Sequence, residues 1–318
     1  MLKKILKVCG ATAAIGVLCL PPLAAQAADS SLSKEEIRFG VGMDPSYSPV
    51  YYAAQNKMFE KAGLNVQLAF VPFGADAVDA VIAGQNQLSG AAEYAVITRA
   101  ARGPVQAFAV FGQSDSYIKL AVRKGITKPE QIKKFGIVAG SAGEYASRKL
   151  MTKNNIDPAS ITWVRGAPPE FPALLARGDV DAYFLWDPWP ERSLSVGGSI
   201  LMNSGQVGYS YNMLIASSER WLKQHPAEAR AVVQVLSEAC QDIRKDPEKA
   251  VVATKAATKM PADQVRKLLG QIECTVRDFT PQDLARYGEI ADFQHDIGST
   301  AKRVDVNTVF QTGYVKGR

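Results

Sequence analysis

Short apolar runs alternate with amphipathic segments along the first third of the chain. The apolar runs predict strands at residues 37–43, 64–73 and 104–112, and a further short strand at the start of 87–103. The amphipathic segments, which end in glycine, predict helices at residues 48–63, 75–84 and the later part of 87–103. Strands that alternate with helices in this way are typical of parallel βαβ units.

The same alternation restarts after residue 125. It predicts strands at residues 135–140, 161–168, 179–186, 199–204 and 209–217. It predicts helices at residues 141–155 and 170–178, and the chain from Ser218 onward is almost wholly helical in pattern. The restart indicates an α/β protein of two lobes, with residues 36–122 and 209–318 in lobe 1 and residues 123–208 in lobe 2.

Two crossings would join these lobes, near residues 116–122 and 209–215, and the helical C-terminal segment would pack on lobe 1. A length of 318 residues agrees with two lobes, because one hydrophobic core rarely serves a chain of this size.

The N-terminal residues 1–27 predict a cleaved secretory signal peptide, and hence a periplasmic protein. Three lysines precede an apolar run at residues 8–20, which ends near an A-x-A site at Ala25 to Ala27. A membrane anchor is disfavoured, because a spanning helix needs about 20 apolar residues. Removal of the three lysines lowers the formal charge from +6 to +3, since the segment holds no acid. Without a basic cluster in the remainder, nucleic acid is not an expected partner.

Cleavage would also leave two of the four cysteines, Cys240 and Cys274. In an oxidising compartment the pair either forms a disulfide or stays as two buried thiols.

The ligand chemistry is expected where strands end and helices begin, since ligands of open α/β sheets bind beyond the carboxyl ends of the strands. Backbone N–H groups at helix starts favour anions, while rings at these corners can flank a ligand. The candidate ligand-binding residues are Asp44, Tyr47, Phe73, Gly74, Glu93, Tyr94, Gln113, Ser141, Gly143, Tyr145, Trp186 and Asp187.

Structural roles compete with ligand binding at several of these positions. Ser141 and Glu144 match a capping box, in which both side chains satisfy the start of their own helix. Glu93 sits where the helix dipole favours an acid, and Asp44 precedes a proline and suits a turn. Asp187 is divided between a helix cap and a ligand partner. If two acids do face the cleft, the ligand must carry a cation or N–H donors as well as any acid group.

Four stretches of the chain resemble the periplasmic solute-binding proteins of the nitrate, sulfonate and taurine type, which include pyrimidine-precursor binders. These stretches are SPVYYAAQNKMFEKAGLNVQL, GAAEYAVITRAARGPVQAFA, FGIVAGSAGEYASRKLM and LLARGDVDAYFLWDPWPERS. The resemblance implies a type II periplasmic binding protein fold, the Venus flytrap, which captures a solute by lobe closure. It further implies a monomer that needs no cofactor and delivers its solute to an ABC permease and its ATPase.

One departure from that family bears on the ligand. The corner after Phe73 lacks the small polar residues that many sulfonate binders place there, which argues against a simple alkanesulfonate and favours an aromatic or amine-bearing solute. Two alternatives stay open: a thiamine-pyrimidine-precursor binder or related synthase-like enzyme, and a periplasmic ligand-sensing subunit. The enzyme is disfavoured, because His225 and His295 lie in the C-terminal helices and no cysteine cluster accompanies them.

Overall fold

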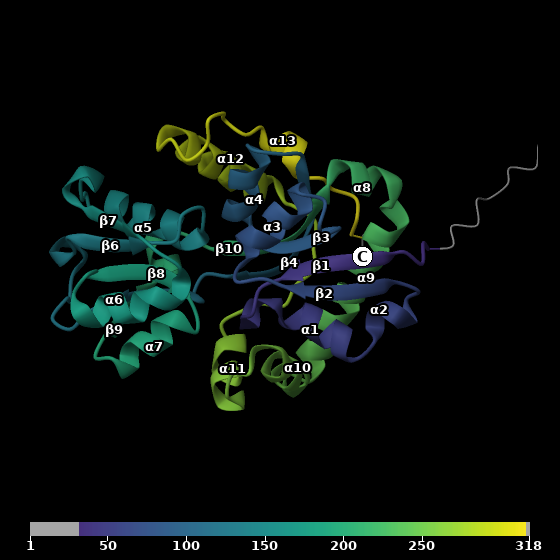
Figure 1. Cartoon of the computed structure of the whole chain (residues 1–318), viewed down its shortest axis with the longest axis horizontal. Helices are drawn as coiled ribbons and strands as arrows, with labels where there is room; N and C mark the ends of the chain where they lie inside the picture. The colour runs from purple at the N-terminus through teal and green to yellow at the C-terminus, as the bar shows by residue number, and fades with distance from the viewer. Residues whose placement is uncertain (1–31, 316–318) are drawn as a thin grey trace, which may run out of the picture. The chain divides into compact units, whose positions relative to one another are not determined.

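The computed structural model describes residues 32–315, so the predicted signal peptide at residues 1–27 lies outside the described part of the chain. Two five-stranded sheets organise this part (Figure 1). The first sheet has the strand order β2 (Asn65–Phe70), β1 (Glu36–Val41), β3 (Leu88–Ala92), β10 (Tyr211–Ser218), β4 (Val105–Ser114). The second has the order β7 (Thr162–Arg165), β6 (Lys134–Ile137), β8 (Ala182–Trp186), β5 (Ile118–Val122), β9 (Ser199–Asn203). The predicted α/β class with two lobes is therefore confirmed.

In the first sheet β1, β2 and β3 run parallel, and β10 lies antiparallel between β3 and β4. Strand β10 returns from the second sheet to a central position here, and its Leu214 and Ile215 are fully buried. A central strand is covered on both faces, which explains why residues 213–216 form a continuous apolar run.

The strand at Ile118–Val122 corrects the predicted lobe boundary. It was expected to close lobe 1, but β5 pairs with β8 and β9 in the second sheet. All five of its residues are buried, so this run needs partners on both edges and finds them in lobe 2. The chain therefore crosses between the sheets at residues 115–117 and returns at residues 209–210.

Helices flank both sheets. The helices that alternate with the strands of the first sheet are α1 (Ser48–Gln55), α2 (Met58–Lys61), α3 (Gly74–Ile82) and α4 (Glu93–Ala100). The helices that alternate with the strands of the second sheet are α5 (Ala142–Lys153), α6 (Phe171–Arg177) and α7 (Trp189–Ser195). Short 3₁₀ turns are η1 (Pro45–Tyr47), η2 (Pro129–Gln131), η3 (Pro158–Ser160), η4 (Pro168–Glu170) and η5 (Ser204–Val207). The single helix predicted over 48–63 is split into α1 and α2, because Lys57 adopts the left-handed conformation with φ 55° and interrupts it.

The C-terminal segment packs on the first sheet and its helices, as predicted. Its helices are α8 (Glu219–Gln224), α9 (Pro226–Lys245), α10 (Glu248–Thr258), α11 (Ala262–Leu269), α12 (Pro281–Asp296) and α13 (Val306–Val309). Helices α9 and α10 contact α1, while α12 contacts α4. Isolated bridges join the edge strand β4 to residues 273, 277 and 310, so this segment also covers an otherwise open sheet edge.

A disulfide joins Cys240 of α9 to Cys274, which lies just after α11. Of the two states that the sequence left open, the structure has the bridged one. Both cysteines lie in the C-terminal segment, so the bridge fixes this segment rather than the cleft. Within residues 32–315 no helix is both long and apolar enough to span a membrane.

Candidate ligand site between the two sheets

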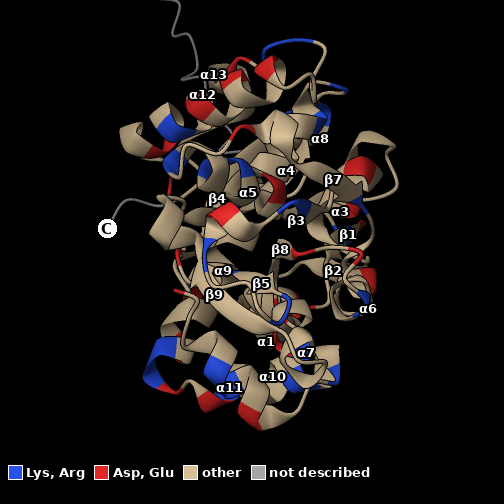
Figure 2. Cartoon of the chain, turned by 90° about the vertical axis from the view of Figure 1, so that its left-hand side faces the viewer, with Lys and Arg blue, Asp and Glu red and all other residues tan. Residues whose placement is uncertain are grey.

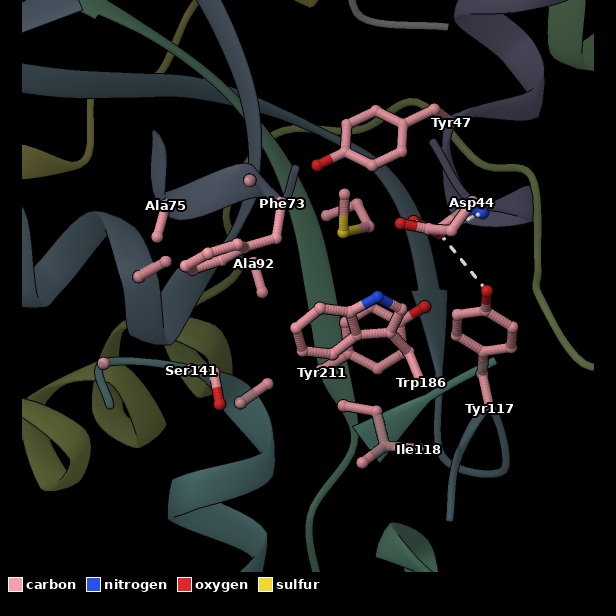
Figure 3. Close-up of a pocket in the computed structure, with 16 residues that line it drawn as sticks. Asp44, Tyr47, Phe73, Ala75, Ala92, Tyr117, Ile118, Ser141, Trp186 and Tyr211 are labelled. Atoms are coloured by element: carbon pink, nitrogen blue, oxygen red, sulfur yellow. Dashed lines mark hydrogen bonds between the residues drawn. The ribbon is translucent and has the colours of Figure 1, made fainter. Parts of the chain in front are cut away.

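A cavity with about 460 Å³ of empty space, part of it open to solvent, lies where the strands of both sheets end (Figure 3). Its lining residues are Asp44, Ser46, Tyr47, Phe73, Gly74, Ala75, Ala92, Ala95, Tyr117, Ile118, Gly140, Ser141, Ala142, Trp186, Tyr211 and Met213. The structure thus brings together six of the predicted site residues: Asp44, Tyr47, Phe73, Gly74, Ser141 and Trp186.

The lining comes from both lobes and from both crossings. Lobe 1 contributes the turns that follow β1, β2 and β3, and lobe 2 contributes the end of β8 and the turn between β6 and α5. Tyr117 belongs to the outgoing crossing, and Tyr211 begins the strand that follows the return. The expectation that ligand chemistry gathers at the carboxyl ends of the strands therefore agrees with the position of the cavity.

Asp44 forms an acidic end of the cavity. Asp44 is 7% exposed, and its Oδ1 accepts hydrogen bonds from the Ser46 N–H at 2.9 Å, from the Ser46 hydroxyl at 2.5 Å and from the Tyr117 hydroxyl at 3.2 Å. No described residue donates a hydrogen bond to its Oδ2. Burial raises the pKa of Asp44 to about 6, although the hydrogen bonds from Ser46 and Tyr117 act in the opposite direction.

Two helix starts form the other end. Helix α3 begins at Gly74 and helix α5 begins at Ala142, one from each lobe. The first N–H groups of a helix have no partner within it, and the helix dipole places partial positive charge there. In Figure 3 Ala75 and Ser141 lie on the side of the cavity opposite Asp44 and Tyr117. The cavity is therefore bipolar, with a carboxylate at one end and anion-favouring amides at the other.

Close packing at the start of α3 requires a glycine. A Cβ at position 74 would lie 2.7 Å from the Tyr47 hydroxyl oxygen and 2.9 Å from the Ala91 Cα. Tyr47 cannot move away easily, because its hydroxyl donates to the Gly90 carbonyl at 3.0 Å. Gly74 thus lets the start of α3 approach the ring that forms one wall of the cavity.

Aromatic rings form most of the remaining wall. Phe73 of lobe 1 and Trp186 of lobe 2 face each other, with ring centroids 6.4 Å apart. Tyr117 and Tyr211 stack with centroids 6.2 Å apart, and both are buried. The Tyr211 hydroxyl has no hydrogen-bond partner among the described residues, so it can donate to or accept from a bound molecule.

The two lobes contact each other in this structure. Arg99 of α4 donates to the carbonyl of Gly140 in lobe 2 at 3.3 Å. Lys267 of α11 pairs with Glu191 of α7 at 2.9 Å, and Figure 2 shows the basic segments of α11 in blue. These contacts join lobe 1 to lobe 2 at separate places around the cleft.

The structure places six of the predicted site residues away from the cavity lining. They are Glu93, Tyr94, Gln113, Gly143, Tyr145 and Asp187.

Asp187 is buried in lobe 2 and has structural partners. It forms an ion pair with Lys119, and its Oδ1 accepts the Glu191 N–H at 3.2 Å at the start of α7. Burial raises the pKa of Asp187, and the Lys119 ammonium opposes this shift. Of its two predicted roles, the geometry shows one close to the cap: the N-cap of α7 is Pro188, and Asp187, one residue before it, accepts an N–H of the first turn. Its neighbour Trp186 faces the cavity, because successive residues of a strand point to opposite faces.

Glu93 is outside the cavity lining and holds the return crossing in place. Its carboxylate accepts hydrogen bonds from the Tyr209 hydroxyl at 2.7 Å and from the Asn212 N–H at 2.8 Å. Burial raises the pKa of Glu93 to about 7, against the effect of these two hydrogen bonds. Tyr145 lies beside it and stacks on Tyr94 across the lobes, with centroids 5.6 Å apart. These three residues support closure rather than line the cavity.

Gln113 and Gly143 have packing roles. Gln113 donates to Glu273 at 2.7 Å and accepts from Arg277 at 2.9 Å, which ties β4 to the C-terminal segment. A Cβ at position 143 would lie 2.1 Å from the Phe184 carbonyl oxygen, so this glycine lets α5 pack closely on β8. Half of the predicted capping box is present: Ser141 accepts the Glu144 N–H at 3.3 Å, but the Glu144 carboxylate accepts the N–H of Gly140, at 2.7 Å, and not that of Ser141.

Sequence reasoning missed the ring of Tyr117 and the ring of Tyr211. Both residues lie within the segments that were predicted as crossings between the lobes. Because a crossing passes the cleft, this position could have indicated that the two rings line it. Ser46 and Met213 were also missed, and nothing in their local pattern distinguishes them from other buried residues.

A model of the family described as NMT1/THI5 like matches residues 44–250 of this chain. Among curated proteins, the chain is 26% identical over 178 residues to the taurine-binding periplasmic protein of Escherichia coli strain K12, a match that covers 55% of each protein. The chain therefore aligns with about half the length of that relative. It is 23% identical over 296 residues to a putative aliphatic sulfonates-binding protein of Bacillus subtilis strain 168, with 89% of this chain and 87% of that protein covered.

Among solved structures, the alkanesulfonate-binding protein SsuA from Xanthomonas axonopodis pv. citri, bound to MOPS, has a similar fold. Its TM-score is 0.79 at 18% identity, and the alignment covers 88% of this chain and 100% of that chain. At this identity the likeness shows the two-lobe fold and leaves the ligand to be argued from the cavity.

Proposed function

Because the chain belongs to the NMT1/THI5-like family, we propose that it is the periplasmic substrate-binding component of an ABC importer for a small organic anion or zwitterion. The observation that carries this proposal is the bipolar cavity, to which both lobes contribute. A solute that touches both lobes at once stabilises the closed state, which is how a two-lobe protein captures a ligand.

The relatives support this class of solute. One binds taurine, a second is named for aliphatic sulfonates, and the solved SsuA structure holds MOPS. Each of these ligands carries a sulfonate, and taurine and MOPS also carry an amine. In the present chain the starts of α3 and α5 would receive the acid group, assisted by the hydroxyl of Ser141.

Closure follows from the contacts between the lobes. Without ligand, rotation about residues 115–117 and 209–210 would separate Phe73 from Trp186 and open the cavity. With ligand, the rings of both lobes contact the same molecule, and the Lys267 to Glu191 pair forms at the rim. An exposed ion pair adds little energy, so the ligand itself must supply most of the preference for the closed state.

The alternatives from the sequence gain no specific support from the geometry. The cavity lining holds neither histidine nor cysteine, the residue types that synthase-like chemistry would use. Among residues 32–315 no group of acids, histidines and cysteines could hold a metal ion. A sensing subunit would use the same cavity with a different membrane partner. Uptake of labelled solute by cells with and without this protein would distinguish transport, with a permease and an ATPase as partners, from sensing, with a receptor as partner.

The ligand is tested directly by mass spectrometry of small molecules released from protein purified without denaturation. Calorimetric titration with taurine, alkyl and aryl sulfonates, aromatic carboxylates and aminopyrimidines then defines the class. Trp186→Ala should weaken binding by at least about tenfold through loss of ring contacts. Trp163→Ala is the matched control, because Trp163 lies on the edge strand β7 and packs under Arg148. Equal loss in both variants, or no response to any solute, would contradict the proposal.

A further inference from the structure

The acidic end of the cavity contains a charge that the fold does not need. Asp44 caps η1 through Oδ1 alone, which accepts the Ser46 N–H, and an asparagine or serine would serve equally well. A buried carboxylate instead incurs a desolvation cost. Its Oδ2 receives no hydrogen bond from the described residues, and the cavity lining holds neither lysine nor arginine to neutralise it. The positive charge that pairs with this carboxylate must therefore come from a molecule bound in the cavity.

The surroundings of Asp44 suit an ammonium group. Tyr47, Tyr117, Tyr211 and Trp186 line the same cavity, and all but Trp186 are buried to more than nine tenths. Aromatic faces attract cations through their quadrupoles, and cages of such rings bind alkylammonium groups. The Tyr117 hydroxyl has one proton to share between the Asp44 carboxylate at 3.2 Å and the Asp187 carbonyl at 3.1 Å, so it cannot replace a cation at Asp44.

We propose that Asp44 and these four rings bind the ammonium end of a zwitterion, whose acid group lies at the starts of α3 and α5. This inference rests on the proposed function and makes it specific: the solute is an amino-sulfonate or similar ω-ammonio acid, rather than a plain alkanesulfonate. The positions of Asp44 and Ser141 at opposite sides of the cavity in Figure 3 fit a molecule charged at both ends.

The test compares taurine with isethionate, in which a hydroxyl replaces the ammonium group at nearly the same size. Both are titrated calorimetrically into the wild-type protein at about pH 7.5, where Asp44 is ionised. We expect taurine to bind at least about tenfold more tightly, as a charge-assisted hydrogen bond predicts. Asp44→Asn and Asp44→Ser, which both retain a cap for η1, should abolish that preference through a loss of taurine affinity.

Asp242→Asn is the control variant. It removes a carboxylate from the same lobe, on α9, where Asp242 accepts the Tyr52 hydroxyl away from the cavity. It should preserve both affinities. Equal affinity of the wild type for taurine and isethionate, or an unchanged preference in both Asp44 variants, would overturn the ammonium site while leaving a sulfonate binder intact. If neither compound, nor any other solute of the broader panel, binds the wild-type protein, the proposed function fails and this inference with it.

Discussion

Glu93 offers a quantitative test of the closed structure, because it is a buried acid with no basic partner at hydrogen-bond distance. Its side chain is 1% exposed, and its two oxygens accept one hydrogen bond each, from Tyr209 and Asn212 at the return crossing. In Glu93→Gln the amide oxygen can still accept the Asn212 N–H, while the amide N–H₂ can donate to the Tyr209 hydroxyl oxygen. The substitution thus removes the charge and retains the hydrogen bonds.

The magnitude follows from the pKa of Glu93, which burial raises from 4.5 to about 7. Between these values the folded protein binds more protons than the unfolded chain, so the free energy of unfolding falls as the pH rises. A pKa shift of this size lowers the free energy of unfolding by about 3 kcal/mol in total, and the loss occurs between about pH 4.5 and 7. Below that window the group is protonated in both states, and the wild type and Glu93→Gln should be equally stable.

Denaturant unfolding of both proteins at a series of pH values measures this difference. We expect Glu93→Gln to become more stable than the wild type by about 3 kcal/mol as the pH rises from about 4 to 8. A stability difference that does not change with pH would refute the assignment of Glu93 as a desolvated carboxylate. A difference that grows in the opposite direction would show that the folded protein stabilises its charge.

Three further predictions concern other parts of the fold. Lys119→Met should lower the free energy of unfolding by about 3–5 kcal/mol at neutral pH, because it leaves Asp187 buried without its cation; thermal or chemical unfolding checks this. Cys240→Ser should cost about 3–4 kcal/mol, since the bridge to Cys274 closes a loop over a sequence separation of 34, and reduction of the wild type should give the same loss. The affinity for an ammonium-bearing solute should fall about tenfold per pH unit below about pH 6, where Asp44 takes up a proton, while isethionate affinity stays level. The titratable groups that interact with Asp44 are Tyr47, Tyr51, Tyr117, Tyr211 and Asp187.

Much of the fold could be predicted, because hydrophobic periodicity reports burial directly. The alternation of strands and helices, with its restart after residue 125, indicated two α/β lobes. Periodicity does not report which neighbour a strand pairs with. Strand β5 was therefore placed in the wrong lobe, since a buried apolar run reads alike in either sheet.

The candidate site was predicted in part, for a related reason. The junctions where a strand ends and a helix begins can be located from the sequence, so the correct edge of each sheet was predicted. They could not show whether a polar residue at a corner faces the cleft or a partner within its own lobe. Asp44 and Asp187 look alike in sequence, yet Lys119 neutralises Asp187, and Asp44 has no such partner in the described residues. Lys119 is distant from Asp187 in sequence, so only the folded structure shows that the two side chains pair.

The most direct test of the account is a crystal structure of the protein with the solute that it retains on purification. We expect the solute to occupy the cavity between the lobes, with its acid group at the first N–H groups of α3 and α5 and an ammonium group beside the Oδ2 of Asp44. A solute bound outside this cavity, or one with its acid group beside Asp44, would contradict this expectation.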